Sequence, residues 1–161
     1  MLPFLLSAVL FAGRPVEPIT PVTVGRMLHQ LGPKQTVDQL AGTGADFGDY
    51  EKVLDGIASG DARWLTLVPK LQPGTDAGTS ESLRIAVAEA LPRNPAAVLR
   101  LIEHNPRWRD VCTYSMIEPT PKETRTYFKA AVPAVKAVKS PRLQRAKLMC
   151  LADLAEAQRS P

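Results

Sequence analysis

Apolar residues recur at helical spacing along nearly the whole chain, and no other feature constrains the fold as much. The set Val24, Met27, Leu28 and Leu31 shows the i, i+3, i+4, i+7 pattern that places apolar side chains on one helix face. Alternation with a period of two, which is typical of half-buried strands, is nearly absent. The pattern predicts an all-α fold without a sheet, with helices over residues 22–31, 34–41, 49–58, 61–71, 80–91, 95–104, 121–138 and 141–158.

Proline positions agree with these helix boundaries. Asn94, Thr120 and Ser140 each precede a proline, so each can cap a helix whose first residue is that proline. Pro69 and Pro133 fall inside helical patterns, where the missing backbone N–H should kink the helix.

An internal repeat links two of the predicted helix pairs. Residues 53–68 align without a gap on residues 87–102, an offset of 34, and both copies break at the same place. The pattern resembles a short HEAT-like helical array over residues 22–158. That resemblance implies a right-handed superhelix of about four antiparallel helical hairpins. Two ordinary hairpins that share an amphipathic pattern are the alternative.

The N-terminal segment suggests export. Residues 1–13 are uncharged and mostly apolar, a length that suits the hydrophobic region of a signal peptide and is too short for a membrane-spanning helix. No Lys or Arg precedes this run and no clean cleavage site follows it, so a segment packed on the core is the alternative. Residues 14–21 hold three prolines, which predicts an extended tether before a single helical domain over residues 22–161.

The two cysteines bear on the same question. Cys112 and Cys150 lie 38 positions apart, which excludes a CxxC motif and a zinc ribbon. We expect a disulfide between them, and two buried thiols are the alternative. The sequence around them also resembles small exported bacterial proteins without assigned activity, a resemblance that implies no catalytic residues. A periplasmic or secreted protein is therefore expected, with a cytoplasmic one as the alternative.

Positive charge is concentrated near the C-terminus. The whole chain has 20 Lys and Arg against 16 Asp and Glu, but residues 121–147 alone carry eight cations and one acid, Glu123. Such a run is either a solvated helix surface or a contact surface for an anionic partner. The second interpretation would have the chain dock on a polyanion or an anionic membrane through Lys129, Lys136, Arg142 and Arg145. Few aromatic residues interleave with these cations, so sequence-specific nucleic-acid binding is not expected.

No motif indicates catalysis, a cofactor or a metal. The chain has two His, and it lacks the local signatures of hydrolases and zinc enzymes. We therefore expect a non-catalytic binding or accessory protein of the bacterial envelope with a protein partner, and a hydrolase with a dispersed site is a third hypothesis. The predicted contact surface comprises loops 42–48 and 72–79 together with Arg107, Trp108 and Arg109. Trp108 would be an anchor for the partner or, alternatively, a lid over the helix ends.

Overall fold

The computed structural model describes residues 17–42, 48–113 and 116–159, and all regular structure in these ranges is helical. The predicted all-α class is therefore confirmed. The predicted signal segment, the first part of the tether and most of loop 42–48 lie outside the described residues. The elements in chain order are α1 (Pro21–Ala41), α2 (Gly48–Ala58), α3 (Ala62–Leu65), α4 (Val68–Leu71), η1 (Gln72–Gly74), α5 (Ala77–Ala90), α6 (Pro95–His104), η2 (Pro106–Thr113), α7 (Pro121–Ala137), η3 (Pro141–Leu143) and α8 (Gln144–Arg159).

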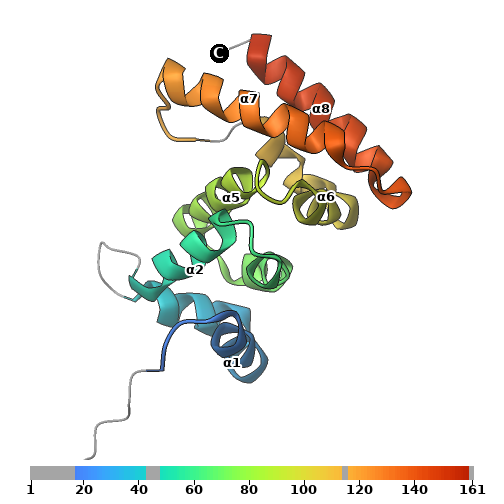
Figure 1. Cartoon of the computed structure of the whole chain (residues 1–161). Helices are drawn as coiled ribbons and strands as arrows, with labels where there is room; N and C mark the ends of the chain where they lie inside the picture. Colours follow the sequence, from blue (N-terminus) through green and yellow to red (C-terminus); the bar gives the residue numbers. More distant parts are fainter. Residues whose placement is uncertain (1–16, 43–47, 114–115, 160–161) are drawn as a thin grey trace, which may run out of the picture.

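The elements follow one another through the molecule in chain order (Figure 1). Helix α1 lies at one end and contacts α2, and α2 lies beside α5 in the middle. Helices α7 and α8 run side by side at the other end, above α6 and η2. The order is that of a row of helical pairs, and the right-handed superhelix of a HEAT-like array stays a prediction.

The two segments that align in the sequence, 53–68 and 87–102, contact each other at their turns. Asn94 Nδ2 donates a hydrogen bond to the Gly60 carbonyl at 2.8 Å, and these residues correspond under the 34-residue offset. Arg93 Nη1 donates to the carbonyl of Ala58 at 2.9 Å in the same contact. Gly60 has a φ of +79°, and a Cβ there would lie 2.8 Å from Arg93 Cβ, so a glycine is needed on both grounds. Equivalent turns therefore pack directly against each other.

Prolines and glycines break the helices where the sequence indicates. Within α1, Gly32 has a φ of 77° and is followed by Pro33, which separates the helix into the two halves that the sequence predicts. The predicted helix over residues 61–71 is divided into α3 and α4, because Pro69 has no N–H with which to continue the helical bonding. Pro133 lies inside α7, as expected.

Buried tyrosine hydroxyls connect neighbouring helices across the core. Tyr50 of α2 donates to the carbonyl of Thr79 in α5 at 3.2 Å, and Tyr127 of α7 donates to the carbonyl of Ala88 at 3.1 Å. Burial raises the pKa of the Tyr50 hydroxyl well above its usual range, with a smaller contribution from the negative charge of Asp76. The hydroxyl therefore stays protonated and keeps its role as donor. The core runs from Val24 in α1 to Leu154 in α8.

Candidate functional site

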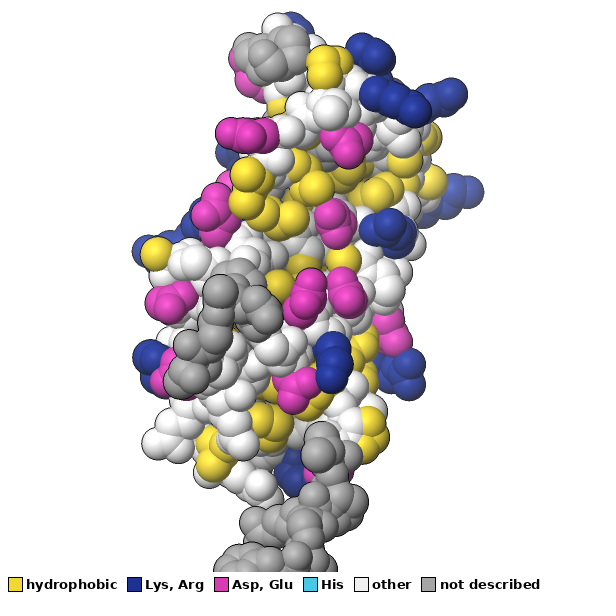
Figure 2. Space-filling view, turned by 90° about the vertical axis from the view of Figure 1, so that its left-hand side faces the viewer, with side chains coloured by type: hydrophobic (Ala, Val, Ile, Leu, Met, Phe, Trp, Pro, Cys, Tyr) yellow, Lys and Arg dark blue, Asp and Glu magenta, His cyan; other side chains and the backbone are white. Residues whose placement is uncertain are grey.

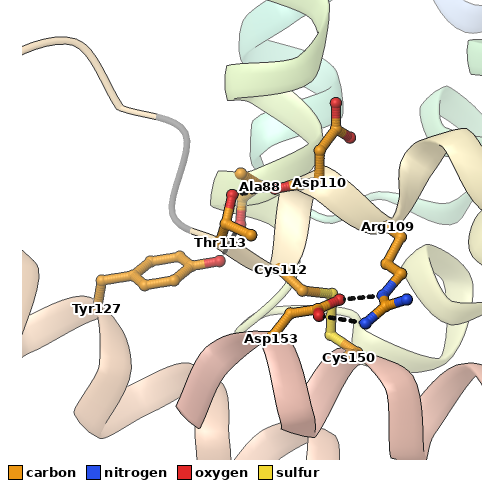
Figure 3. The surroundings of a disulfide bond; sticks show 8 residues. All are labelled: Ala88, Arg109, Asp110, Cys112, Thr113, Tyr127, Cys150 and Asp153. Carbon is orange, nitrogen blue, oxygen red and sulfur yellow. Dashed lines mark hydrogen bonds and ion pairs between the residues drawn. A yellow bond between two sulfur atoms is a disulfide. The ribbon is translucent and has the colours of Figure 1, made fainter. Parts of the chain in front are cut away.

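The predicted cysteine pair is brought together between η2 and α8. The Sγ atoms of Cys112 and Cys150 lie 2.02 Å apart, which is bonding distance, and both side chains are completely buried. Beside them, the Arg109 guanidinium forms two contacts of 2.5 Å with the carboxylate of Asp153 (Figure 3). The cysteine pair and the ion pair together fix η2 onto α8.

Of the two interpretations of Trp108, its position favours the lid over the helix ends and not the partner-facing anchor. Trp108 is 4% exposed and belongs to the core cluster. Residues 106–113 form the 3-10 helix η2, whose spacing turns Trp108, Val111 and Cys112 inward together. The alternative interpretation, a lid over the helix ends, agrees with this burial. Arg107 and Arg109 are both exposed, but Arg109 pairs with Asp153, whose hydrogen bonds and negative charge raise the pKa of Arg109.

The predicted loop 72–79 is a short ordered connection between α4 and α5. Its first residues form η1 and its last residues begin α5, with Asp76 as the cap. Gly74 is buried against the break in α1, where an added Cβ would lie 2.3 Å from the carbonyl carbon of Pro33. Residues 73 and 76–78 are nevertheless exposed, so the role of this segment in a partner contact stays a prediction.

The cationic run of the sequence lies on the outer surface of α7, η3 and α8. Seven of its Lys and Arg side chains are exposed, and we call them the cationic surface: Lys122, Arg125, Lys129, Lys136, Lys139, Arg142 and Arg145. In Figure 2, Lys and Arg side chains gather along the upper right-hand edge, on the part formed by α7 and α8, whereas carboxylates are interspersed over the rest of this face. Four of the seven, at positions 122, 125, 129 and 136, share one face of α7 because their spacing is 3, 4 and 7.

The cationic surface differs from the rest of the molecule in its lack of ion pairs. The described ion pairs use cations from other parts of the chain, namely Arg26, Lys34, Lys52, Arg63, Arg84, Arg109 and Arg159. No ion pair within the described ranges involves a residue of the cationic surface. The eighth cation of the run, Lys147, is engaged: its Nζ donates to the carbonyls of Lys136 and Val138 at 2.6 and 2.8 Å and so caps the end of α7.

The single acid of this region is committed to the start of α7. Glu123 accepts from the backbone N–H and the hydroxyl of Thr120 at 2.8 and 2.6 Å, and its own N–H donates to the Thr120 hydroxyl at 3.3 Å, which completes a capping box. These hydrogen bonds lower the pKa of Glu123. The acid therefore stays ionised and forms no described ion pair with the neighbouring cations, which outnumber it.

A cleft opens where the first half of α7 faces the end of α8. Its volume is about 750 Å³. Pro119, Pro121, Phe128 and Ala157 form its apolar walls, and Arg125 and Lys129 of the cationic surface stand at its edge. We call it the α7–α8 cleft. The sequence signals for it were the helical spacing of Phe128 and the cationic face of α7, but nothing in the sequence places the end of α8 opposite them.

The described residues offer little for metal chemistry or membrane insertion. Both histidines, His29 and His104, are exposed. Within residues 17–42, 48–113 and 116–159, no three metal-ligating side chains gather into a cluster. None of the described helices combines the length and apolar character needed to cross a bilayer.

The described part of the chain thus combines the cysteine pair between η2 and α8 with an exposed cationic surface, whose residues form no described ion pair, beside an apolar cleft. Such a surface can attract and orient an anionic macromolecule. Comparison of the chain with known protein families, with curated proteins and with solved structures finds no match.

Proposed function

We propose that this chain is a non-catalytic binding protein of the bacterial envelope that uses its cationic surface to hold an acidic face of a partner protein. The observation that carries the proposal is the set of seven exposed Lys and Arg side chains that form no described ion pair, in a molecule whose other cations are mostly paired. Surface charges without internal partners raise association rates with a complementary surface and select against like-charged ones.

A protein partner suits this surface better than a nucleic acid. Proteins that bind single strands stack bases on exposed aromatic rings. The two aromatic residues of α7, Tyr127 and Phe128, are only 9% and 4% exposed and pack edge-to-face with each other. Neither of these two rings is therefore exposed enough to act as a stacking platform beside the cations.

An envelope location is supported by the cysteine pair. Disulfides persist in oxidising compartments and are rare in the reducing cytosol. The buried Cys112 and Cys150, with sulfur atoms at bonding distance, fit such a compartment. The apolar residues 1–13 would act as the export signal.

An anionic membrane is the second candidate, because one large apolar side chain is exposed next to the cations. Leu148 of α8 is 65% exposed and follows Arg145 by three positions, so both lie on the same outward face. The exposed face of α7 carries no large apolar side chain, whereas interfacial helices usually present a continuous apolar face. We therefore place the acidic protein first.

Two variants with the same change of net charge test the proposal. The first is R125Q/K129Q/K136Q, on the cationic surface. The control is K70Q/R100Q/R107Q, which removes three exposed cations that likewise form no described ion pair but lie elsewhere. The probe is labelled poly-L-glutamate, with binding followed by fluorescence anisotropy at several salt concentrations.

Each exposed ion pair contributes about 0.2–1 kcal/mol, so the loss of three should raise the Kd for poly-L-glutamate by roughly 3-fold to 150-fold. The control should bind nearly as well as the wild type, and binding by both should weaken as salt rises. Equal losses in the two variants would show that the site is not on α7. Binding to vesicles of anionic phospholipid but not to poly-L-glutamate would favour the membrane instead.

A further inference from the structure

We infer that the α7–α8 cleft binds an acidic peptide segment of the partner that carries an apolar side chain, which enters the cleft while its flanking carboxylates pair with Arg125 and Lys129. This inference rests on the proposed function and adds the kind of segment that is bound. The juxtaposition that supports it is an apolar recess with two unpaired cations on one of its edges.

The walls of the cleft suit an apolar side chain. Pro119 precedes α7 and Pro121 begins it, Phe128 lies seven residues further along α7, and Ala157 lies in the last turn of α8. Because Ala157 has only a methyl group, it leaves the recess between the two helices open. A volume of about 750 Å³ accommodates a short segment with a large side chain, and it is far too narrow for a nucleic-acid duplex.

The charges at the edge favour an anionic segment. Arg125 and Lys129 are separated by four positions, so they lie one turn apart on the same face of α7, and both are exposed. The amide groups at the start of α7 are already served by the capping box of Thr120 and Glu123, so these two side chains supply the positive charge. An arginine can hold a carboxylate through two parallel hydrogen bonds.

The neighbouring cleft on the other side of α7 lacks this character. It has a volume of about 670 Å³ and is lined by Glu89 and Glu123 as well as by Arg93 and Lys122. Its charges balance, and Arg93 already donates to the carbonyls of Ala58 and Glu89. Charge complementarity therefore selects the α7–α8 cleft for an acidic segment.

Two labelled peptides and two variants test the inference. One peptide consists of Asp and Glu with Leu and Phe at its centre, and the other has Ser in place of these two apolar residues. Ala157→Leu fills the cleft without a change of charge. Ala155→Leu makes the same change on the exposed side of α8 and is the matched control. Circular dichroism verifies that both variants are folded.

Wild type should bind the apolar peptide about tenfold more tightly than the Ser peptide, a difference of about 1.4 kcal/mol. Ala157→Leu should abolish this preference and Ala155→Leu should keep it. Equal binding of the two peptides by the wild type overturns the inference whether or not Ala157→Leu folds. If both peptides then still lose affinity in R125Q/K129Q/K136Q, the proposed function stands without the cleft. If neither peptide binds the wild type, the proposed function fails as well.

Discussion

Replacement of Gly56 by alanine should destabilise the protein, although the same change in an unobstructed helix is stabilising. Gly56 lies inside α2, where alanine is favoured over glycine by about 1 kcal/mol. A Cβ at this position, however, would lie 2.4, 2.5 and 2.6 Å from Nε1, Cε2 and Cδ1 of the Trp64 indole. Whether the substitution stabilises or destabilises the protein therefore depends on whether the indole can move away from the added methyl group.

The surroundings of Trp64 oppose such a movement. A normal contact needs about 1 Å of additional separation, and Trp64 is 8% exposed within the core cluster. Overpacking a filled core costs typically about 1–3 kcal/mol, and a clash with a rigid aromatic ring lies at the upper end of that range. After the gain in helix propensity is subtracted, we expect Gly56→Ala to lower the free energy of unfolding by about 1–2 kcal/mol.

Urea denaturation measures this difference through the transition midpoint. Gly25→Ala is the control, because Gly25 also lies inside a helix but an added Cβ meets only Leu67 Cδ2, at an ordinary 3.9 Å. The control should be neutral or stabilising by up to about 1 kcal/mol. Trp64→Leu combined with Gly56→Ala should cost less than the sum of the single changes. A Gly56→Ala protein as stable as the wild type would refute the close packing of α2 against α3.

Three further changes probe separate contacts. Replacing Cys112 and Cys150 by alanine opens a loop of 38 residues and should lower the free energy of unfolding by about 4 kcal/mol. A reductant should therefore lower the melting temperature of the wild type and leave that of the variant unchanged. Asn94→Ala removes both the cap of α6 and the hydrogen bond to the carbonyl of Gly60. It should lower the free energy of unfolding, measured by urea denaturation, by about 1–2 kcal/mol. No measurable change would contradict the turn contact. The hydrogen bonds from Thr79 hold the pKa of Asp76 below its usual 3.8, so this stabilisation is complete above about pH 4 and is lost as the pH falls through the lowered pKa. Asp76→Ala should therefore flatten the acid end of the stability–pH curve, and an unchanged curve would contradict this assignment.

Local signals predicted most of the helices correctly because each helix end has its own chemical cause. Thr120 and Asn94 cap α7 and α6 with their side chains, as their positions before proline indicate. Gly32 breaks α1 through its positive φ. The division of the predicted helix 61–71 into α3 and α4 goes further than the expected kink, since Thr66 and Leu67 separate the two short helices and Pro69 lies in the first turn of the second.

The site was harder to predict because it depends on contacts between distant segments. The apolar residues Trp108, Val111 and Cys112 do have the i, i+3, i+4 spacing of one helix face, but the arginines on either side of Trp108 favoured an exposed segment. The partner of Arg109, Asp153, lies 44 residues away and could not be paired with it from the sequence. The cationic surface was visible as a charge run, whereas the α7–α8 cleft required knowledge of where Ala157 meets Phe128.

The most direct measurement of where a partner binds is a backbone NMR titration of the full protein with the acidic peptide that carries Leu and Phe. The mass of 17.5 kDa is suitable for assignment of the amide signals. Shifts concentrated in residues 119–130 and in the last turns of α8, and weakened by added salt, are the result expected of the cationic surface and its cleft. Shifts centred on α1 and α2, with the amides of α7 unchanged at saturation, would contradict it.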